Sequence, residues 1–328
     1  MKIRANSIDI EVEDSGRGDA GEDRPVVLLI MGLGMQLVAW PPAFVQALID
    51  AGYRVIRHDN RDVGLSHRFE ALGKPRLLLQ GLRYKLGLKP QAPYSVADMA
   101  ADSLDVLDAL GIETAHVLGV SMGGMIAQRM ALAAPERVLS LTSVMSTSGA
   151  KGLAQAHPKV MRVLLSRPKG RDPQVVLKHY VRLFKAIGSP GFPTPEHEMR
   201  ERILLGVERG YYPVGTLRQM LAIMADITRP AQLRRITAPT LVLHGKADPL
   251  LPFVHGEDTA KRINGARLVG IEGMGHDLPP GVVTHLLAAL LPHLKAAQAS
   301  RNTQAQAQAQ AQTQTLSLSP VSNQNSSP

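Results

Sequence analysis

The chain has 328 residues, of which 45% are hydrophobic and 20% are charged, enough for one large core or a core with a smaller second unit. It has no cysteine, which excludes disulfides, thiolate metal sites and a cysteine nucleophile. The formal net charge is +9, and residues 151–235 alone hold 16 basic and 6 acidic residues. The N-terminus carries no apolar run that would form a secretory signal, so we expect a cytoplasmic protein.

The first part of the chain alternates between apolar stretches that predict strands and amphipathic stretches that predict helices. Residues 26–31 form a continuous apolar run of the type that is buried on both faces in a parallel sheet. The other elements expected before residue 146 are a hairpin over 3–13, a helix to about 50, a strand over 53–57, a helix over 95–110, a strand over 115–118, a helix over 124–132 and a strand over 138–145. This alternation predicts a doubly wound, mostly parallel α/β sheet.

The later part of the chain first changes to helix after helix and then returns to strands. The expected elements are helices beginning at 172, 195 and 214, strands over 240–243 and 266–270, and a last helix over 282–295. We therefore expect a core formed by 1–145 and 236–298, a helical cap over 146–235, a basic lid-like insertion at 67–94, and a tail at 299–328. The tail is rich in Gln, Ala and Ser and poor in large apolar residues, so we expect it to be disordered.

Residues 119–123 read Gly-Val-Ser-Met-Gly and lie between an expected strand and an expected helix. In that context, Gly-x-Ser-x-Gly is typical of a nucleophile elbow, a sharp turn that projects the serine from the end of a sheet. The turn is so tight that the positions of Gly119 and Gly123 must lack bulk. Ser121 is therefore the candidate nucleophile, and its position indicates acyl-transfer chemistry.

A serine nucleophile needs a base and an acid that orients the base, and on this type of sheet they follow in the order Ser, acid, His. Asp248 follows a short strand after a glycine-containing loop, and it is the candidate acid. His276 follows the next strand in a glycine-rich loop, and it is the candidate base. We interpret His244 as a packing residue, and the loop that contains Asp59 and Asp62 as structural.

Backbone N–H groups are needed where the negative charge of a tetrahedral intermediate develops. Met122, directly after the nucleophile, and Leu33, in the loop after the strand 26–31, are the candidate donors, with Gly34 as the second choice in that loop. Residues near these positions and on the cap predict an apolar, adaptable substrate pocket. The pocket candidates are Met31, Gly32, Gly34, Met145, Met220, Met224 and Met274.

The motifs of other enzyme classes are incomplete in this chain. Gly32-x-Gly34 lacks the third glycine of a dinucleotide fingerprint, no phosphate-binding loop motif occurs, and His197-Glu198 has no second histidine for zinc. We therefore expect no cofactor, no metal and no nucleic-acid partner.

Over residues 1–297 the chain resembles the α/β-hydrolase fold superfamily, through the Ser121 motif, Asp248 and the Gly-Met-Gly-His sequence that ends at His276. The stretches 31–41 and 55–64, and Pro239-Thr-Leu-Val, are similar to the aclacinomycin methylesterase-type subgroup. Many superfamily members have His-Gly where this chain has Met-Gly, and glycine where it has Asp62; both departures agree with the subgroup. The resemblance implies a carboxylic ester hydrolase without a cofactor.

The expected function is hydrolysis of carboxylic esters, methyl esters included, through a Ser-His-Asp triad and an acyl-enzyme. An acyltransferase, a perhydrolase, a lactonase and a ligand receptor with a vestigial triad remain as alternatives. We expect a small substrate that is apolar or partly anionic. The basic cap could meet an acidic carrier protein or an anionic membrane surface, and residues 77–89, apolar with basic residues, could form a lid over the site or contact anionic lipid.

Overall fold

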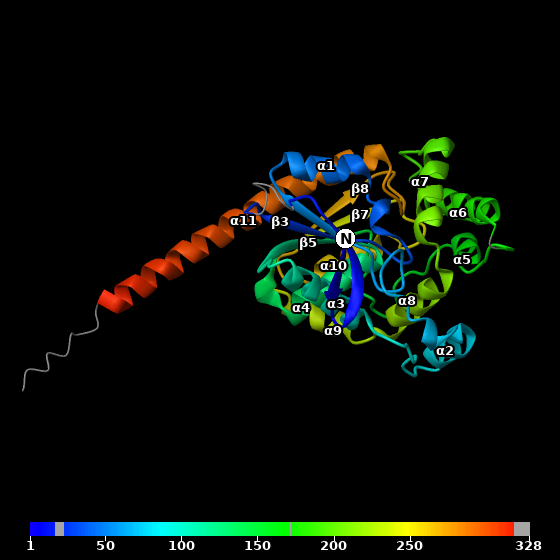
Figure 1. The fold of residues 1–328 in the computed structure, drawn as a ribbon, viewed down its shortest axis with the longest axis horizontal. Coiled ribbons are helices and arrows are strands. Elements are labelled where there is room, and N and C mark those ends of the chain that lie inside the picture. The colour runs from blue at the N-terminus through cyan, green and yellow to red at the C-terminus, as the bar shows by residue number, and fades with distance from the viewer. Residues whose placement is uncertain (17–22, 171, 318–328) are drawn as a thin grey trace, which may run out of the picture.

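The computed structural model describes residues 1–16, 23–170 and 172–317, which fold around one eight-stranded sheet (Figure 1). The strands lie in the order β1-β2-β4-β3-β5-β6-β7-β8. Their bounds are β1 Lys2–Ala5, β2 Ile8–Asp14, β3 Val26–Ile30, β4 Arg54–His58, β5 Ala115–Val120, β6 Val138–Val144, β7 Thr240–Gly245 and β8 Arg267–Ile271. Strand β2 pairs antiparallel with β1 and with β4, and all other pairs are parallel. The predicted mostly parallel α/β sheet is confirmed.

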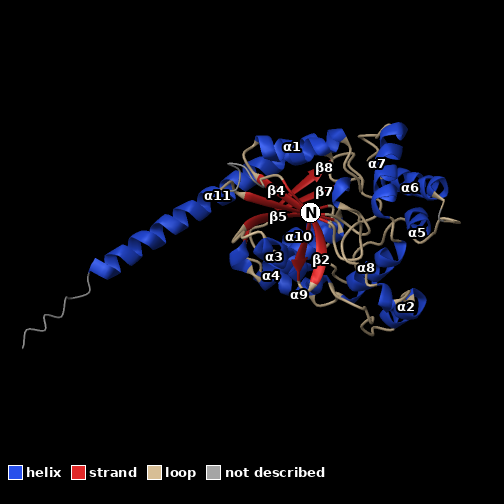
Figure 2. Ribbon diagram, viewed as in Figure 1, coloured by secondary structure: helices blue, strands red, loops and turns tan. Residues whose placement is uncertain are grey.

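Helices cover both faces of the sheet (Figure 2). Their bounds are α1 Pro42–Asp50, α2 Leu77–Lys85, α3 Val96–Ala109, α4 Met122–Ala133, α5 Pro158–Leu164, α6 Pro173–Ile187, α7 Glu196–Gly210, α8 Pro213–Ala225, α9 Arg229–Gln232, α10 Val254–Arg262 and α11 Pro280–Ser317. Apolar residues of α3 and α4 pack on one face, and those of α1 and α11 on the other. Strands β3 and β5 are buried along their whole length because both faces are covered.

Helices α5 to α8 follow β6 in the chain and gather at one end of the sheet (Figure 1). Helices α6 and α7 form a small apolar cluster of their own around Leu177, Val181 and Ile203. Neither α5 nor α10 is predicted from the sequence, because α5 has only seven residues and α10 is mostly polar. Helix α8 ends at Ala225, so Asp226 caps its C-terminus and does not lie within it.

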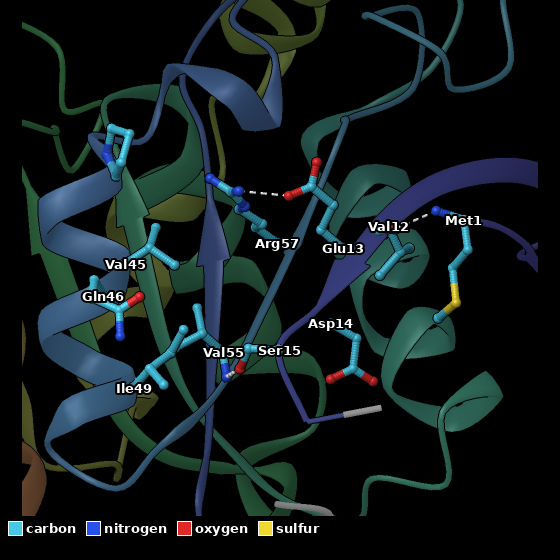
Figure 3. A pocket seen from close by; sticks show the side chains of 11 residues that line it. Met1, Val12, Glu13, Asp14, Ser15, Val45, Gln46, Ile49, Val55 and Arg57 are labelled. Atoms are coloured by element: carbon cyan, nitrogen blue, oxygen red, sulfur yellow. Dashed lines mark hydrogen bonds and ion pairs between the residues drawn. The ribbon is translucent and has the colours of Figure 1, made fainter. Parts of the chain in front are cut away.

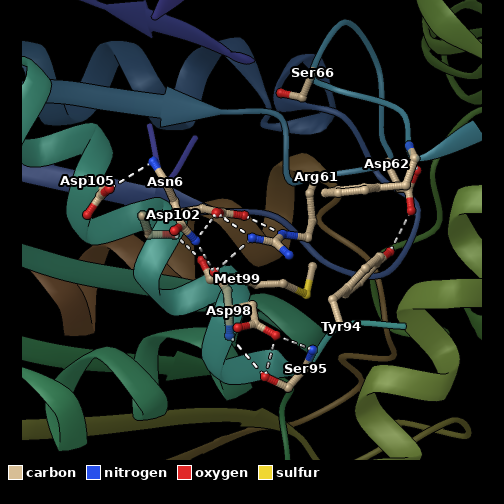
Figure 4. A network of polar contacts seen from close by, with 12 residues as sticks. Asn6, Arg61, Asp62, Ser66, Tyr94, Ser95, Asp98, Met99, Asp102 and Asp105 are labelled. Carbon is tan, nitrogen blue, oxygen red and sulfur yellow. Dashed lines mark hydrogen bonds and ion pairs between the residues drawn. The ribbon is translucent and has the colours of Figure 1, made fainter. Parts of the chain in front are cut away.

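Buried ion pairs connect this cap to the loop that follows β4. Arg209 of α7 binds Asp59 at 2.6 Å, and Arg218 of α8 binds Asp62 at 2.8 Å. The carboxylate of Asp62 also accepts a hydrogen bond from the hydroxyl of Tyr94 (Figure 4). Removing one partner of such a buried pair typically costs about 3–5 kcal/mol, because the other charge remains buried. The interpretation of this loop as structural is confirmed.

The same loop is anchored to α3 by Arg61. Its guanidinium donates two hydrogen bonds of 2.6 Å to the carboxylate of Asp102, a residue that also accepts from the amide of Asn6 (Figure 4). Paired donors in a fixed fork hold a carboxylate in one orientation. The loop after β4 therefore forms a rigid platform between the sheet and the cap.

Helix α11 continues without a break to Ser317, into the segment 299–328 for which the sequence predicts disorder. Alanine and glutamine have high helix propensity, which outweighs the scarcity of apolar residues in this repeat. Residues 318–328 lie outside the described residues. The helix leaves the body of the protein in Figure 1, and the last side chain of α11 that is buried against the core among those described is Ala297.

A chain that ends at Ser300 should keep the thermal midpoint of the full chain to within about 2 °C, since Ser300 to Thr303 are exposed. A chain that ends at Lys295 should unfold at a distinctly lower temperature. That cut removes Ala297 and Gln298, whose side-chain oxygen lies 3.3 Å from Nε2 of His116. Scanning calorimetry of the three chains measures the difference. Equal midpoints for both truncations would contradict this assignment of the core boundary.

Candidate functional site

Ser121 lies at a strained turn between β5 and α4. Its backbone has φ +55° and ψ −118°, a conformation that side chains rarely adopt. A Cβ added to Gly119 would lie 2.0 Å from the carbonyl oxygen of Gly123, and one added to Gly123 would lie 2.0 Å from that of Ile30. Neither position therefore admits a side chain, which is the steric reason for the spacing of the two glycines.

The structure brings Ser121, His276 and Asp248 together from three segments. Asp248 follows β7 and His276 follows β8, so both lie beyond the carboxyl ends of parallel strands, as does Ser121 after β5. The Nε2 atom of His276 is 3.0 Å from Oγ of Ser121, and its Nδ1 atom is 2.7 Å from Oδ2 of Asp248. An ionised Asp248 can only accept a hydrogen bond, so Nδ1 of His276 carries the hydrogen and Nε2 has a free lone pair directed at the Ser121 hydroxyl.

The carboxylate of Asp248 is buried but well bound. Burial acts to raise its pKa, yet the charge and hydrogen bond of His276 outweigh burial and hold the pKa below the ordinary value. Its Oδ1 atom accepts hydrogen bonds from the backbone N–H groups of Leu250 and Leu251, at 2.9 and 2.8 Å. Burial lowers the pKa of neighbouring His244, which therefore stays neutral and whose Nε2 donates to the Leu251 carbonyl, in agreement with a packing role.

The loop that carries His276 is held by the end of α6 in the cap. The His276 N–H donates to the Ile187 carbonyl at 2.7 Å, and the Gly275 N–H donates to Oγ of Ser189 at 2.8 Å. The Ser189 hydroxyl in turn donates to the carboxylate of Asp277, whose pKa burial raises. Sequence reasoning missed Ser189 and Asp277. Asp277 could have been noticed beside His276, whereas nothing in the sequence links Ser189 to a residue 88 positions away.

The loop after β3 lies directly against Ser121. A Cβ added to Gly32 would lie 3.2 Å from Cβ of Ser121. The N–H of Gly34 is already engaged, since it donates to Oε1 of Gln219 at 2.9 Å. This favours Leu33 over Gly34 as the loop donor to an oxyanion. Met122 is the first residue of α4, so its N–H has no partner within the helix.

A cavity of about 70 Å³ separates the cap from the core beside this loop. Among the pocket candidates, Gly34 lines it, together with Tyr180, Phe184, Arg202 and Tyr211 of the cap. The other pocket candidates lie elsewhere. Met31, Met145 and Met274 are buried in the core cluster under α1 and α11. Met220 and Met224 are half-buried on α8, and Gly32 packs on Ser121. In a chain with 4% aromatic residues, methionine fills irregular gaps of the core.

A larger cavity of about 540 Å³ lies between β2, β4 and α1 (Figure 3). Its wall includes the ion pair of Arg57 with Glu13. Ligands of open α/β sheets bind beyond the carboxyl ends of the strands, whereas this cavity is lined by Val55 and Arg57 within β4 itself. It is therefore separate from the site at Ser121.

Among the residues that the structure describes, no group of three or more His, Asp or Glu side chains is arranged to hold a metal ion. Within the same residues, no helix is both long enough and apolar enough to cross a bilayer.

The sequence profile of the family described as "alpha/beta hydrolase fold" matches residues 25–181. Rhodomycin D methylesterase DauP of Streptomyces sp. (strain C5) is 34% identical over 309 residues, covering 88% of this chain and 96% of that protein; DnrP of Streptomyces peucetius, with the same activity name, is 33% identical with the same coverage. The solved structure of 2-hydroxy-6-oxo-6-phenylhexa-2,4-dienoate hydrolase from Rhodococcus sp. strain RHA1 superposes with a TM-score of 0.66 at 20% identity, covering 90% of this chain and 97% of that one. The chain belongs to the α/β-hydrolase fold family and is related to its methylesterases.

Replacing Asp248 by asparagine should lower kcat by about 10⁴ with little change in KM, because the amide favours the wrong tautomer of His276. Steady-state hydrolysis of p-nitrophenyl acetate measures both constants. Asp258→Asn is the matched control, since that carboxylate binds Arg262 and Ser148 away from the site. A loss below about tenfold for Asp248→Asn would place the orienting acid elsewhere.

Proposed function

We propose that this chain is a serine carboxylic ester hydrolase that cleaves methyl esters through a covalent acyl-enzyme on Ser121. Ester hydrolysis follows from the family and from the relationship to named methylesterases. The observation that carries the finer proposal is the continuous hydrogen-bonded series from Oγ of Ser121 through His276 to Asp248, with distances of 3.0 and 2.7 Å.

In this mechanism, Oγ of Ser121 attacks the ester carbonyl while Nε2 of His276 takes the serine proton. Asp248 holds the imidazole in the required tautomer and stabilises the imidazolium that forms. The N–H groups of Leu33 and Met122 bind the oxyanion of the tetrahedral intermediate. His276 then donates its proton to the leaving alkoxide, which departs as the alcohol, methanol for a methyl ester.

The second half of the reaction repeats these steps with water. His276 removes a proton from a water molecule that attacks the acyl carbonyl, the oxyanion forms again at the same two N–H groups, and Ser121 leaves with the proton from His276. The products are a carboxylic acid and the regenerated serine. Every proton transfer uses the side chain of His276, and the reaction needs no cofactor.

The cavity lies beside the loop of Leu33 without being lined by Ser121 or His276, and its aromatic lining supports a substrate with a flat apolar part. Tyr180 and Tyr211 contact edge to face, with ring centroids 6.1 Å apart, and Phe184 and Tyr212 add further aromatic surface. At about 70 Å³ the cavity is smaller than the roughly 300–1,000 Å³ typical of ligand pockets. We therefore propose that the cap moves away from the core to admit the substrate.

Ser121→Ala should lower kcat for p-nitrophenyl acetate by roughly 10⁶, because the nucleophile of a triad cannot be replaced by its partners. The folded state should persist, which circular dichroism verifies. A panel of methyl esters, assayed by methanol release with Ser121→Ala as the blank, defines the acyl preference. A Ser121→Ala enzyme with near-normal turnover would refute the proposal.

The basic insertion adds a proposal about a partner. Five leucines on α2 and in the turn after it are exposed, and Leu78 is 93% exposed. They are Leu78, Leu79, Leu82, Leu86 and Leu88. Basic side chains flank them: Lys74, Arg76, Arg83, Lys85 and Lys89. Exposed apolar side chains with basic side chains beside them can bind the surface of an anionic membrane. We propose that α2 binds such a surface.

The full-length protein should sediment with phosphatidylcholine vesicles that contain phosphatidylglycerol, less so with phosphatidylcholine alone, and less at high salt. Leu78→Ser combined with Leu82→Ser should abolish this binding without affecting turnover of p-nitrophenyl acetate. Leu165→Ser, at a leucine that is 58% exposed beyond α5, is the matched control and should bind as the unchanged protein does. Equal binding by all variants, or by none, would end the membrane proposal.

A further inference from the structure

One cap residue reaches the loop that we propose to bind the oxyanion. Gln219 of α8 is completely buried, and its side chain bridges two core loops. Its Oε1 atom accepts the N–H of Gly34 at 2.9 Å, and its Nε2 atom donates to the carbonyl oxygen of Arg61 at 2.8 Å. A backbone N–H only donates and a carbonyl only accepts, so the two contacts fix the orientation of the amide.

The packing around Gln219 makes this bridge close-fitting. A Cβ added to Gly34, which has φ +66°, would lie 2.6 Å from Oγ1 of Thr216 on the same helix. One added to Gly215 would lie 2.0 Å from the carbonyl oxygen of Asp62. Helix α8 therefore packs closely on the loops that follow β3 and β4, with no room for a side chain at Gly34 or at Gly215.

The segment that carries Leu33 is held at both sides. On one side, the Met31 carbonyl accepts from the Asn60 side chain at 3.0 Å. On the other side, Gln219 holds the N–H of Gly34. These two contacts determine the direction of the peptide groups between them. They also keep the Gly34 N–H away from the intermediate, which leaves the neighbouring Leu33 N–H as the donor.

We propose that Gln219 is a positioning residue for the oxyanion hole: through Gly34, it orients the N–H of Leu33 toward the oxyanion of the tetrahedral intermediate attached to Ser121. The inference rests on the proposed serine-esterase function and goes beyond it. It makes the cap part of the catalytic apparatus, because movement of α8 would also release the loop. A cap that opens to admit substrate would thereby disassemble the oxyanion hole until it closes again.

Gln219→Met keeps the length of the side chain and removes both hydrogen bonds. It should lower kcat for p-nitrophenyl acetate by about 10- to 100-fold, part of the 10²–10³ that one oxyanion donor contributes, while KM changes less than about threefold. The affinity for a trifluoromethyl ketone, which forms a tetrahedral adduct with the nucleophilic serine, should fall by a similar factor. The affinity for acetate, a planar product, should not change.

Gln219→Glu should introduce a pH dependence of kcat that a purely structural role of Gln219 would not produce. When protonated, the introduced carboxyl can accept from Gly34 and donate to the Arg61 carbonyl, as the amide does. When ionised, it places negative charge against that carbonyl. Burial raises the pKa of a carboxyl, so the ratio of variant to wild-type kcat should fall as the pH rises through that pKa. Using the ratio cancels the pH dependence that both enzymes share.

Arg129→Gln is the matched control, since it breaks the ion pair with Asp226 that anchors the other end of α8 and leaves Gly34 untouched. It should lower the stability of the protein without selectively lowering the affinity for the trifluoromethyl ketone. If Gln219→Met retains wild-type kcat, or loses affinity equally for the ketone and acetate, the inference is wrong. If Gln219→Met gives one of these results while Ser121→Ala is inactive, only this inference is wrong. If Ser121→Ala stays active, the proposed function is wrong as well.

Discussion

The close approach of backbone segments around Ser121 is the constraint on which the rest of the site depends. At Gly119 and Gly123 an added Cβ would come within 2.0 Å of a carbonyl oxygen, so the strand, the turn and α4 pack without side chains between them. That packing forces the serine into a backbone conformation with φ +55°. Because the turn ends a buried strand, the sheet fixes the serine hydroxyl relative to the loops after β3, β7 and β8. The catalytic geometry is thus set by backbone packing at the carboxyl edge of the sheet.

The cap acts on this edge through hydrogen bonds and ion pairs as well as apolar packing. Its α6 end holds the loop of His276, while Arg218 and Gln219 of α8 hold the loops after β4 and β3. A buried charge pair tolerates little displacement, since separating it leaves each charge uncompensated. If the cap moves to admit substrate, as we propose, these contacts would break together, and substrate entry would be coupled to the assembly of the site.

The sequence predicted those features that depend on local patterns. Apolar runs gave the buried strands, and the Gly-x-Ser-x-Gly motif placed Ser121, because both signals lie within a few residues. Long-range pairings could not be read in this way: Gln219 meets Gly34 across 185 positions, and no local pattern marks it. Which methionines line a cavity could not be read from the sequence, because composition alone does not distinguish a core gap from a cavity wall. The extent of α11 could not be read either, because alanine and glutamine favour a helix while the scarcity of apolar residues disfavours fixed structure.

The central claim is that the substrate's acyl group is bound covalently to Ser121 during turnover. Its most direct test is rapid quenching of the enzyme with a p-nitrophenyl ester, followed by mass spectrometry of the intact protein and its peptides. We expect a burst of p-nitrophenol and one acyl adduct, located on the peptide that contains Ser121, which disappears as the ester is exhausted. Steady turnover with the adduct on another residue, or with none formed under conditions that trap acyl-enzymes, would contradict the account.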